Sequence, residues 1–308
     1  MSKLKGIIRK MSGSVGDLTF KSLNGATIVS EKITSVANPR TNKQMKVRTK
    51  WANIVAMYKG IRPLLNYGFE NRPHNLTDYN MFVKVNMQLP AVYLTKQAVA
   101  GGACVAAPYQ ITQGSLPAIV LSGNGQSVAT DIALGIDGIS ASTTVAQFAS
   151  AVVENNIDYQ YGDQISFFLV KQKVNADTEV PYCQFSSCKV VLDATNTDIL
   201  WDVVNRNGFS SQDGHLAHSG NDGDCAYCWV HSRKSANGKT LVSSQVLVSA
   251  NSILSDYQGD LAYNLASSSY GQGKSAFLTP DADAAESAGG TGGNSGGGGN
   301  GGGGNDSL

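Results

Sequence analysis

The 308-residue sequence predicts an α+β fold that is mainly β. We expect an N-terminal hairpin and an amphipathic helix, followed by one or two antiparallel β-sandwich or barrel-like domains with a packed helix. Three observations lead to this prediction: an Asn-Gly turn near the start, a capped helical segment from residue 38, and short Val-, Ile-, Tyr- and Phe-rich runs from residue 89. The predicted organisation is 1–37 (basic arm and hairpin), 38–88 (basic helical segment), 89–175 and 176–280 (β-rich regions) and 281–308 (Gly-rich flexible tail).

The hairpin is predicted from the turn between residues 18–23 and 26–33. Asn24-Gly25 favours the positive φ angles of a type I′ turn, which joins two antiparallel strands tightly. Glycines at positions 6, 13 and 16 indicate an extended, flexible arm before it.

A helix is predicted between Asn38 and Phe69. Thr41 and Gln44 have the spacing of a capping box, and Gly60 and Pro63 mark the end of the helix. Apolar residues at helical spacing form a stripe that we expect to be its docking face: Val47, Trp51, Ile54, Val55 and Tyr58. Lysines 43, 46 and 50 follow one edge of this stripe, and Arg48 and Lys59 follow the other.

The remainder of the chain has the composition of short strands. Residues 75–87 are predicted to form a second helix or a helical turn, and residues 143–156 a helix whose Val145, Phe148, Ala149 and Val152 face a sheet. The β-rich runs are bounded by Gly, Pro and Ser and comprise residues 90–99, 108–112, 116–122, 164–174, 189–193, 197–204 and a hairpin of 225–233 with 240–248. Two sheet domains, at about 89–175 and 180–255, would fit this pattern.

Charge is distributed unevenly along the chain. Residues 1–85 hold 15 of the 24 Lys and Arg but only 4 of the 23 Asp and Glu, so their net charge is +11 and that of the remainder is −10. Such asymmetry indicates contact with nucleic acid or head-to-tail contact between copies. The alternative is a solvated basic face that has no partner.

The basic segment is the strongest candidate for a functional site. Its cations can neutralise phosphates without reading base sequence, or can meet an acidic surface on a neighbouring subunit. The candidate residues are Arg9, Lys10, Arg40, Lys43, Lys46, Arg48 and Lys50. No helix-turn-helix, zinc-finger or RNA-recognition signature accompanies them, so any DNA contact is expected to lack sequence specificity.

One group of residues has the composition of a metal site. It comprises His215, His218, Cys225, Cys228 and His231. Because the Cys-x-x-Cys motif falls in a predicted strand, its two thiols would point to opposite faces of a sheet. We therefore favour buried thiols over zinc, and predict neither a metal nor a cofactor.

We expect the protein not to be an enzyme. Gly273, Lys274 and Ser275 resemble the end of a phosphate-binding loop, but Ser268 stands where that motif needs its first glycine. No nucleophile–base arrangement is recognisable among the four histidines. Five cysteines, an odd number, favour reduced thiols, and the sequence contains neither a signal peptide nor a membrane-spanning run.

The N-terminal third resembles an uncharacterised family of bacterial and phage-associated proteins. The resemblance covers about 85 residues and part of the β region, and combines a Gly-x-x-Gly hairpin with an Asn-Pro-Arg-Thr-x-x-Gln cap. The residues that carry it are Gly13, Gly16, Asn38, Pro39, Arg40, Thr41, Gln44 and Arg48. It implies an origin near mobile elements and supplies no catalytic residue.

These observations together favour a virion structural protein, capsid or tail-associated, that self-assembles. Its partners would be further copies, other virion proteins or DNA, and it would be made in the host cytoplasm before joining the particle. The alternatives are a non-specific DNA-binding or packaging accessory protein and a zinc-stabilised surface- or carbohydrate-binding β module.

Overall fold

The computed structural model describes residues 2–4, 12–23, 26–34, 41–63, 68–89, 91–124, 127–135 and 138–271. It confirms an α+β fold that is mainly β and built from antiparallel sheets, and the described strands close no barrel. Arg9, Lys10, Arg40 and the Gly-rich tail at 281–308 lie outside the described residues.

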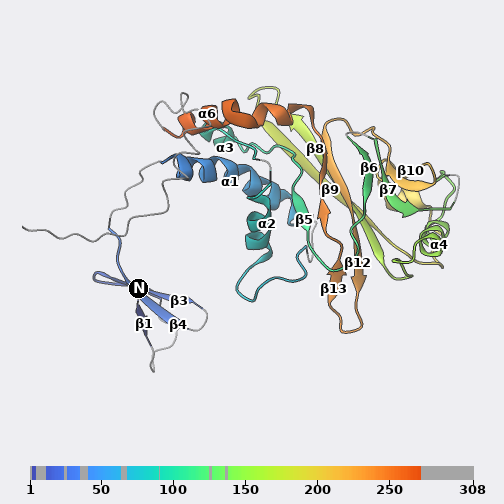
Figure 1. Ribbon diagram of the computed structural model, residues 1–308, viewed down its shortest axis with the longest axis horizontal. Helices are drawn as coiled ribbons and strands as arrows, with labels where there is room; N and C mark the ends of the chain where they lie inside the picture. The colour runs from blue at the N-terminus through green and yellow to red at the C-terminus, as the bar shows by residue number, and fades with distance from the viewer. Residues whose placement is uncertain are drawn as a thin grey trace, which may run out of the picture.

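The N-terminal residues form a small sheet that stands apart from the body of the molecule (Figure 1). The predicted hairpin is present, because Leu23 pairs with Ala26 and leaves only Asn24-Gly25 between the strands. The expected arm contributes two further strands to this sheet. The strands, in the order β1-β4-β3-β2, are β1 (Ser2–Leu4), β2 (Gly13–Val15), β3 (Leu18–Leu23) and β4 (Ala26–Glu31).

The helical segment contains α1 (Asn42–Ile61) and α2 (Asp78–Asn86). Helix α1 begins with the predicted capping box of Thr41 and Gln44, and it ends at Ile61, between Gly60 and Pro63, which were predicted to mark its end. A strand was predicted at 90–99, but residues 91–95 are irregular and α3 (Lys96–Ala100) follows. The prediction was wrong because Thr95 accepts a hydrogen bond from the Ala98 N–H and so caps a short helix.

A central sheet with long strands organises the body. Its order is β13-β12-β8-β9, and β15 also pairs with β12. The strands are β8 (Gln164–Val174), β9 (Pro181–Val191), β12 (Cys225–Lys234), β13 (Thr240–Val242) and β15 (Val248–Ala250). As predicted, β12 and β13 form a hairpin, in which Gly238 has a φ of 79°.

Both faces of this sheet are buried. Phe167, Leu169, Tyr227 and Trp229 point into one core, which α4 and a second sheet cover. Phe148, Ala149 and Val152 of α4 lie in this core, as predicted. The covering elements are β6 (Leu121–Asn124), β7 (Ser127–Ala133), α4 (Val145–Asn155), α5 (Leu200–Val203), β10 (Ser210–Gln212) and β11 (His215–His218).

The other face supports a second core. Phe168, Val170, Cys228 and Val230 point into it and pack against α1, α2 and the extended residues 103–111. Further elements on this side are β5 (Gln110–Thr112), β14 (Gln245–Val246), the 3₁₀ helix η1 (Ser252–Tyr257) and α6 (Gly259–Ser269). In Figure 1, α1, α3 and α6 lie at one end of the body and α4 lies at the opposite end.

The expected pair of sheet domains is replaced by shared sheets. Strand β8 pairs with β12, β7 pairs with β11, and β5 pairs with β14, so every such pair crosses the boundary placed at residue 175. The sequence left one or two domains open. Grouping strands by proximity in sequence suggested two, whereas pairing here joins strands far apart in the chain. A strand was also predicted at 197–204, where the short helix α5 forms.

Buried side-chain amides hold the extended residues 103–112 in place. Most of this segment lies outside any sheet, so its backbone groups need other partners. Asn53 of α1 accepts from Val105 N (2.8 Å) and donates to Val105 O (2.9 Å), which reproduces a strand-like pairing. Asn86 of α2 makes the same two contacts with Gln110, at 2.8 and 2.9 Å.

Replacing Asn53 should therefore test this arrangement. Asn53→Ala leaves the Val105 N–H and C=O buried without these partners, and we expect the free energy of unfolding to fall by about 2–4 kcal/mol. The exposed Asn80→Ala on α2 is the matched control and should change it by less than about 0.5 kcal/mol. Urea denaturation measures both; equal effects in the two variants would contradict the proposed role of Asn53.

Candidate functional site

The described basic residues of α1 divide into two groups. Lys43 and Lys46 are exposed and Arg48 is half-buried at the surface. Lys50 instead turns inward, and its Nζ donates to Met87 O at 2.5 Å and Leu89 O at 2.7 Å, just beyond the end of α2. Burial, reinforced by Lys46, lowers the pKa of Lys50. This residue therefore serves the fold, because a cation there satisfies carbonyl groups at a helix C-terminus.

The predicted apolar stripe only partly coincides with the buried face of α1. Ile54 is fully buried, Val55 and Tyr58 are half-buried, and Val47 and Trp51 are 50% and 40% exposed. The buried face is rotated from the predicted stripe and comprises Met45, Thr49, Asn53, Ile54, Met57 and Ile61. The rotation was missed because Thr49 and Asn53 are polar, yet their hydrogen bonds to Met45 O and Val105 allow both to be buried.

The exposed edge of α1 borders a groove of about 550 Å³ beside β9. The groove is apolar and aromatic, with two cations and no carboxylate among the residues that line it. Its principal lining residues are Arg48, Trp51, Val55 and Lys59 from α1 and Tyr182 and Phe185 from β9. This combination suits a ligand that presents an apolar group flanked by negative charge.

Gly60 allows α1 and β9 to lie this close. A Cβ at position 60 would overlap the ring of Phe185. We predicted Gly60 as punctuation at the helix end, but it lies inside the last turn of α1 and its missing side chain makes room for β9.

Two thiols also line the groove. Cys183 Sγ donates to Cys104 O at 3.3 Å. The hydrogen bond to Cys183, together with burial, raises the pKa of Cys104 well above its ordinary value. Because the thiolate is the reactive form, Cys104 is held in its unreactive form at neutral pH.

The candidate metal ligands do not come together. Cys225 lies in one core and Cys228 in the other, because they point to opposite faces of β12. His218 Nε2 lies 2.9 Å from Asp222, and His231 Nε2 lies 2.8 Å from Asp163. Across the described ranges, no three His, Cys, Asp or Glu residues form a group that could hold a metal, so His215, His218, Cys225, Cys228 and His231 make no zinc site.

A buried ion pair lies at one end of the central sheet and was missed from sequence. Arg233 holds Asp163 through two hydrogen bonds, at 2.7 and 2.6 Å. His231 contributes the third contact and stacks on Tyr159, with ring centroids 4.3 Å apart. Burial alone would raise the pKa of Asp163, but the bonds from Arg233 and His231 outweigh it and lower the value to about 2. The cluster joins β12 to the loop that precedes β8.

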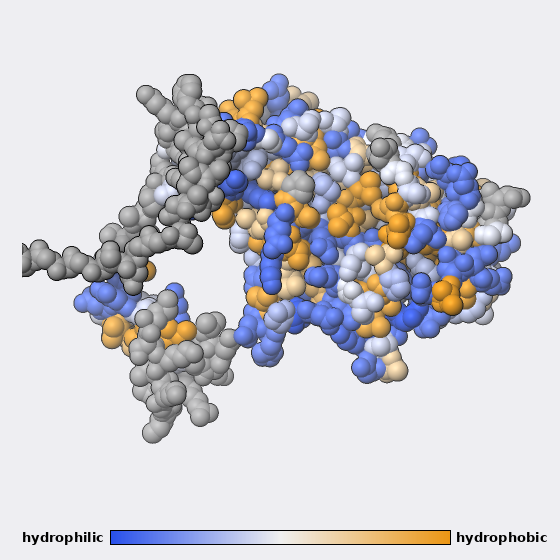
Figure 2. Space-filling view, in the orientation of Figure 1, coloured by the Kyte–Doolittle hydropathy of each residue, from blue (hydrophilic) through white to orange (hydrophobic). Residues whose placement is uncertain are grey.

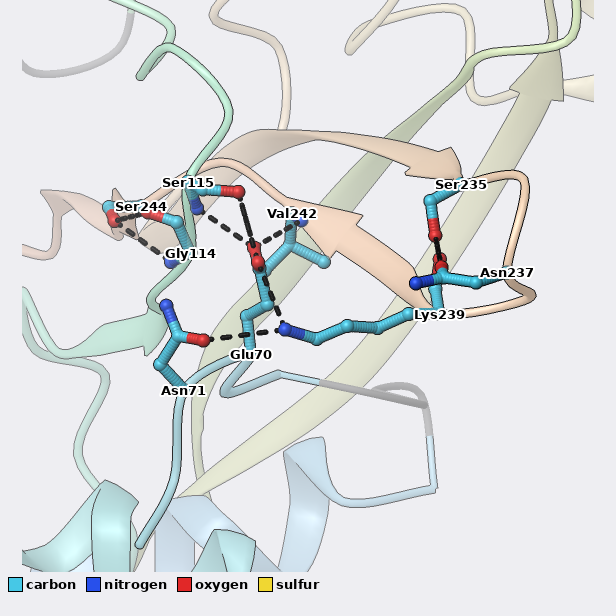
Figure 3. Close-up of polar contacts among 9 residues, drawn as sticks. All are labelled: Glu70, Asn71, Gly114, Ser115, Ser235, Asn237, Lys239, Val242 and Ser244. Atoms are coloured by element: carbon cyan, nitrogen blue, oxygen red, sulfur yellow. Dashed lines mark hydrogen bonds and ion pairs between the residues drawn. The ribbon is translucent and has the colours of Figure 1, made fainter.

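A second carboxylate joins the loop after α1 to the β12–β13 hairpin (Figure 3). Glu70 accepts from Ser115 N at 2.8 Å and Ser115 Oγ at 2.9 Å, and Lys239 Nζ lies 3.3 Å away. Burial opposes ionisation, but the Ser115 and Lys239 bonds prevail and lower the pKa of Glu70. No local pattern marked Glu70, because its partners lie about 45 and 170 residues away in sequence.

The sequence comparison identifies the class of protein. The chain matches a family of unknown function (DUF6266) over residues 10–166. That match spans half of the chain, and the protein belongs to this family. No match was found among curated proteins or among solved structures. In the described part of the chain, no helix has both the length and the apolar composition that crossing a bilayer requires.

Two lysines of α1 should respond differently to removal of their charge. Lys50→Met removes the donors to Met87 and Leu89 and should lower the free energy of unfolding by about 1–2 kcal/mol. Lys43→Met on the exposed side should change it by less than about 0.5 kcal/mol. Denaturant titration of both variants measures the difference. If Lys50→Met left the free energy of unfolding unchanged, the role of Lys50 in holding the end of α2 would be overturned.

Asp163 should make stability depend on acid pH. Because its pKa is about 2 in the folded state and ordinarily 3.8, the unfolded chain binds the proton more readily. The stabilisation is complete above the ordinary value, disappears as pH falls toward 2, and amounts to about 2 kcal/mol.

Unfolding curves between pH 6 and pH 2.5 measure this dependence. Asp163→Asn should be less stable than the parent at pH 6 and should lose less stability over the same range. The exposed Asp177→Asn at the β8–β9 turn is the control. Parallel profiles for Asp163→Asn and the parent would contradict the assignment.

Proposed function

We propose that this chain is a self-assembling structural protein of a virion, capsid or tail-associated, and that the α1 groove receives a neighbouring copy. The groove is the observation that carries the proposal. Its lining is partly open to solvent, since Trp51 and Tyr182 are 40% and 37% exposed. Apolar surface rimmed by polar groups is typical of protein interaction sites.

The opposite end of the body supplies a surface of complementary charge. Exposed carboxylates surround α4, and the 193–202 loop joins them because Asp198 O accepts from Val145 N at 2.9 Å. These carboxylates are Asp131, Glu154, Asp158, Asp198 and Asp202. In Figure 2 the visible face at this end is largely hydrophilic. A basic end and an acidic end on one body favour head-to-tail contact between copies.

The virion setting is supported by composition. Charged residues make up only 15% of the chain, short strands are abundant, and the C-terminal tract is rich in glycine. A chain with few charged residues suits an assembled shell. Contacts between subunits bury part of its surface, which in a separate protein would need charged residues to stay soluble.

One observation favours a second candidate, a non-specific DNA-binding or packaging accessory protein. Lys43 and Lys46 are exposed one turn apart on α1. Lysines in this arrangement can contact phosphates without reading bases.

Self-association of the purified chain tests the leading proposal. We expect the mass measured by light scattering to rise with protein concentration, and negative-stain microscopy to show regular particles, tubes or rings. Added salt should weaken the association, because it screens the charges that the two ends bring together. A strict monomer at high concentration, with and without DNA, would overturn the proposal.

The same preparation distinguishes the DNA-binding candidate. A chain that stays monomeric alone, binds duplex DNA, and loses affinity with salt and with Lys43→Ala plus Lys46→Ala would support that candidate.

A further inference from the structure

The turn between α4 and β8 presents an isolated apolar side chain. Ile157 is 99% exposed, and it lies between the exposed carboxylates Glu154 and Asp158. An isoleucine this exposed gains nothing from the fold of its own chain. The turn itself is held firmly. Arg233 Nη2 donates to Asp158 O at 2.8 Å, and the side-chain amide of Asn156 accepts from Ala133 N and donates to Ala133 O.

The exposed Ile157 side chain, called the knob below, cannot reach the α1 groove of its own molecule. The groove lies at the Tyr182 end of β9, whereas the turn lies beside the other end, where Gly162 N donates to Leu192 O. Val191 lies nine residue steps after Tyr182 along the extended strand, which is about 30 Å at the rise of a β-strand. Any contact between knob and groove must therefore join two molecules.

We propose that Ile157 of one copy docks in the α1 groove of a second copy, with Glu154 and Asp158 facing Arg48 and Lys59. The inference rests on the proposed self-assembly and names the surfaces that perform it. The two surfaces match in polarity and in charge. An aliphatic side chain meets a lining of Trp51, Val55 and Phe185, and two carboxylates meet two cations.

The geometry of this contact determines the type of assembly. The two surfaces differ and lie at opposite ends of the β8–β9 hairpin, so the interface is heterologous. A pair of copies retains one unused groove, on the copy that supplied the knob, and one unused knob, on the copy that supplied the groove. Such contacts continue as open chains, or close as rings when the rotation between copies allows it.

Substitution of the knob is the first test. Ile157→Asp should weaken self-association at least tenfold by sedimentation velocity, because it places a third carboxylate where the groove is apolar. Val246→Asp on β14 is the control, since Val246 is also an exposed aliphatic residue (42%) and lies in neither proposed surface, and it should change the association less than twofold. Wild-type assembly that Ile157→Asp leaves unchanged would overturn this inference while leaving the proposed function standing. A monomeric wild type would overturn the proposed function itself.

Charge exchange provides the second test. Glu154→Lys with Asp158→Lys in one variant, and Arg48→Glu with Lys59→Glu in another, should each abolish self-association. Mixing the two variants should restore assembly, because each then offers a knob or groove whose charge complements the other variant. Near-ultraviolet circular dichroism of each variant verifies that its fold is intact. A mixture of folded variants that remains unassembled would overturn the proposed pairing.

Discussion

Burial of the β8–β12 pair on both faces is the constraint on which the rest of the structure depends. Phe167, Leu169, Tyr227 and Trp229 occupy one side and Phe168, Val170, Cys228 and Val230 the other, so neither face can meet water. Each face consequently needs its own cover. Helix α4 with the β10-β11-β7-β6 sheet covers one side, and α1, α2 and the 103–111 segment cover the other.

The cover formed by α1, α2 and the 103–111 segment includes buried backbone that lies mostly outside any sheet. Residues 103–109 run through the core outside any strand. Cys104 N donates to Pro181 O and Tyr109 O accepts from Leu247 N, but the peptide groups between them would be costly to bury without partners. The amides of Asn53 and Asn86 supply partners from α1 and α2, and Gln172 of β8 accepts from Ala106 N at 2.8 Å. These same amides fix the rotation of α1, because Asn53 must face inward. Trp51 is thereby turned toward the groove beside β9, so the groove is a consequence of how the buried polar groups of the core are satisfied.

Local patterns were sufficient for elements that local chemistry decides. The capping box at Thr41, strand β8 and the inward residues of α4 were all predicted, since periodicity and caps act over a few residues. The pairing of β8 with β12 was not predicted. The β9 side of the groove was not predicted either, because Tyr182 and Phe185 are more than 120 residues from α1. Lys50 illustrates the same limit. Its spacing places it with the other lysines of α1, and only the arrival of the α2 C-terminus makes it an internal cap.

The charge asymmetry of the sequence takes a more specific form once these contacts are known. Lys50 binds carbonyl groups at the end of α2, whereas Lys43, Lys46, Arg48 and Lys59 lie at the surface of α1, and Arg48 and Lys59 line an apolar groove. Binding to a phosphate backbone requires cations but no apolar cleft between them. A protein surface that presents one aliphatic group with flanking carboxylates uses both the cations and the apolar cleft. The turn at Ile157 has that composition and lies, like α1, within the family match at 10–166. The proposed contact between copies would therefore use more of the α1 surface than a contact with nucleic acid would.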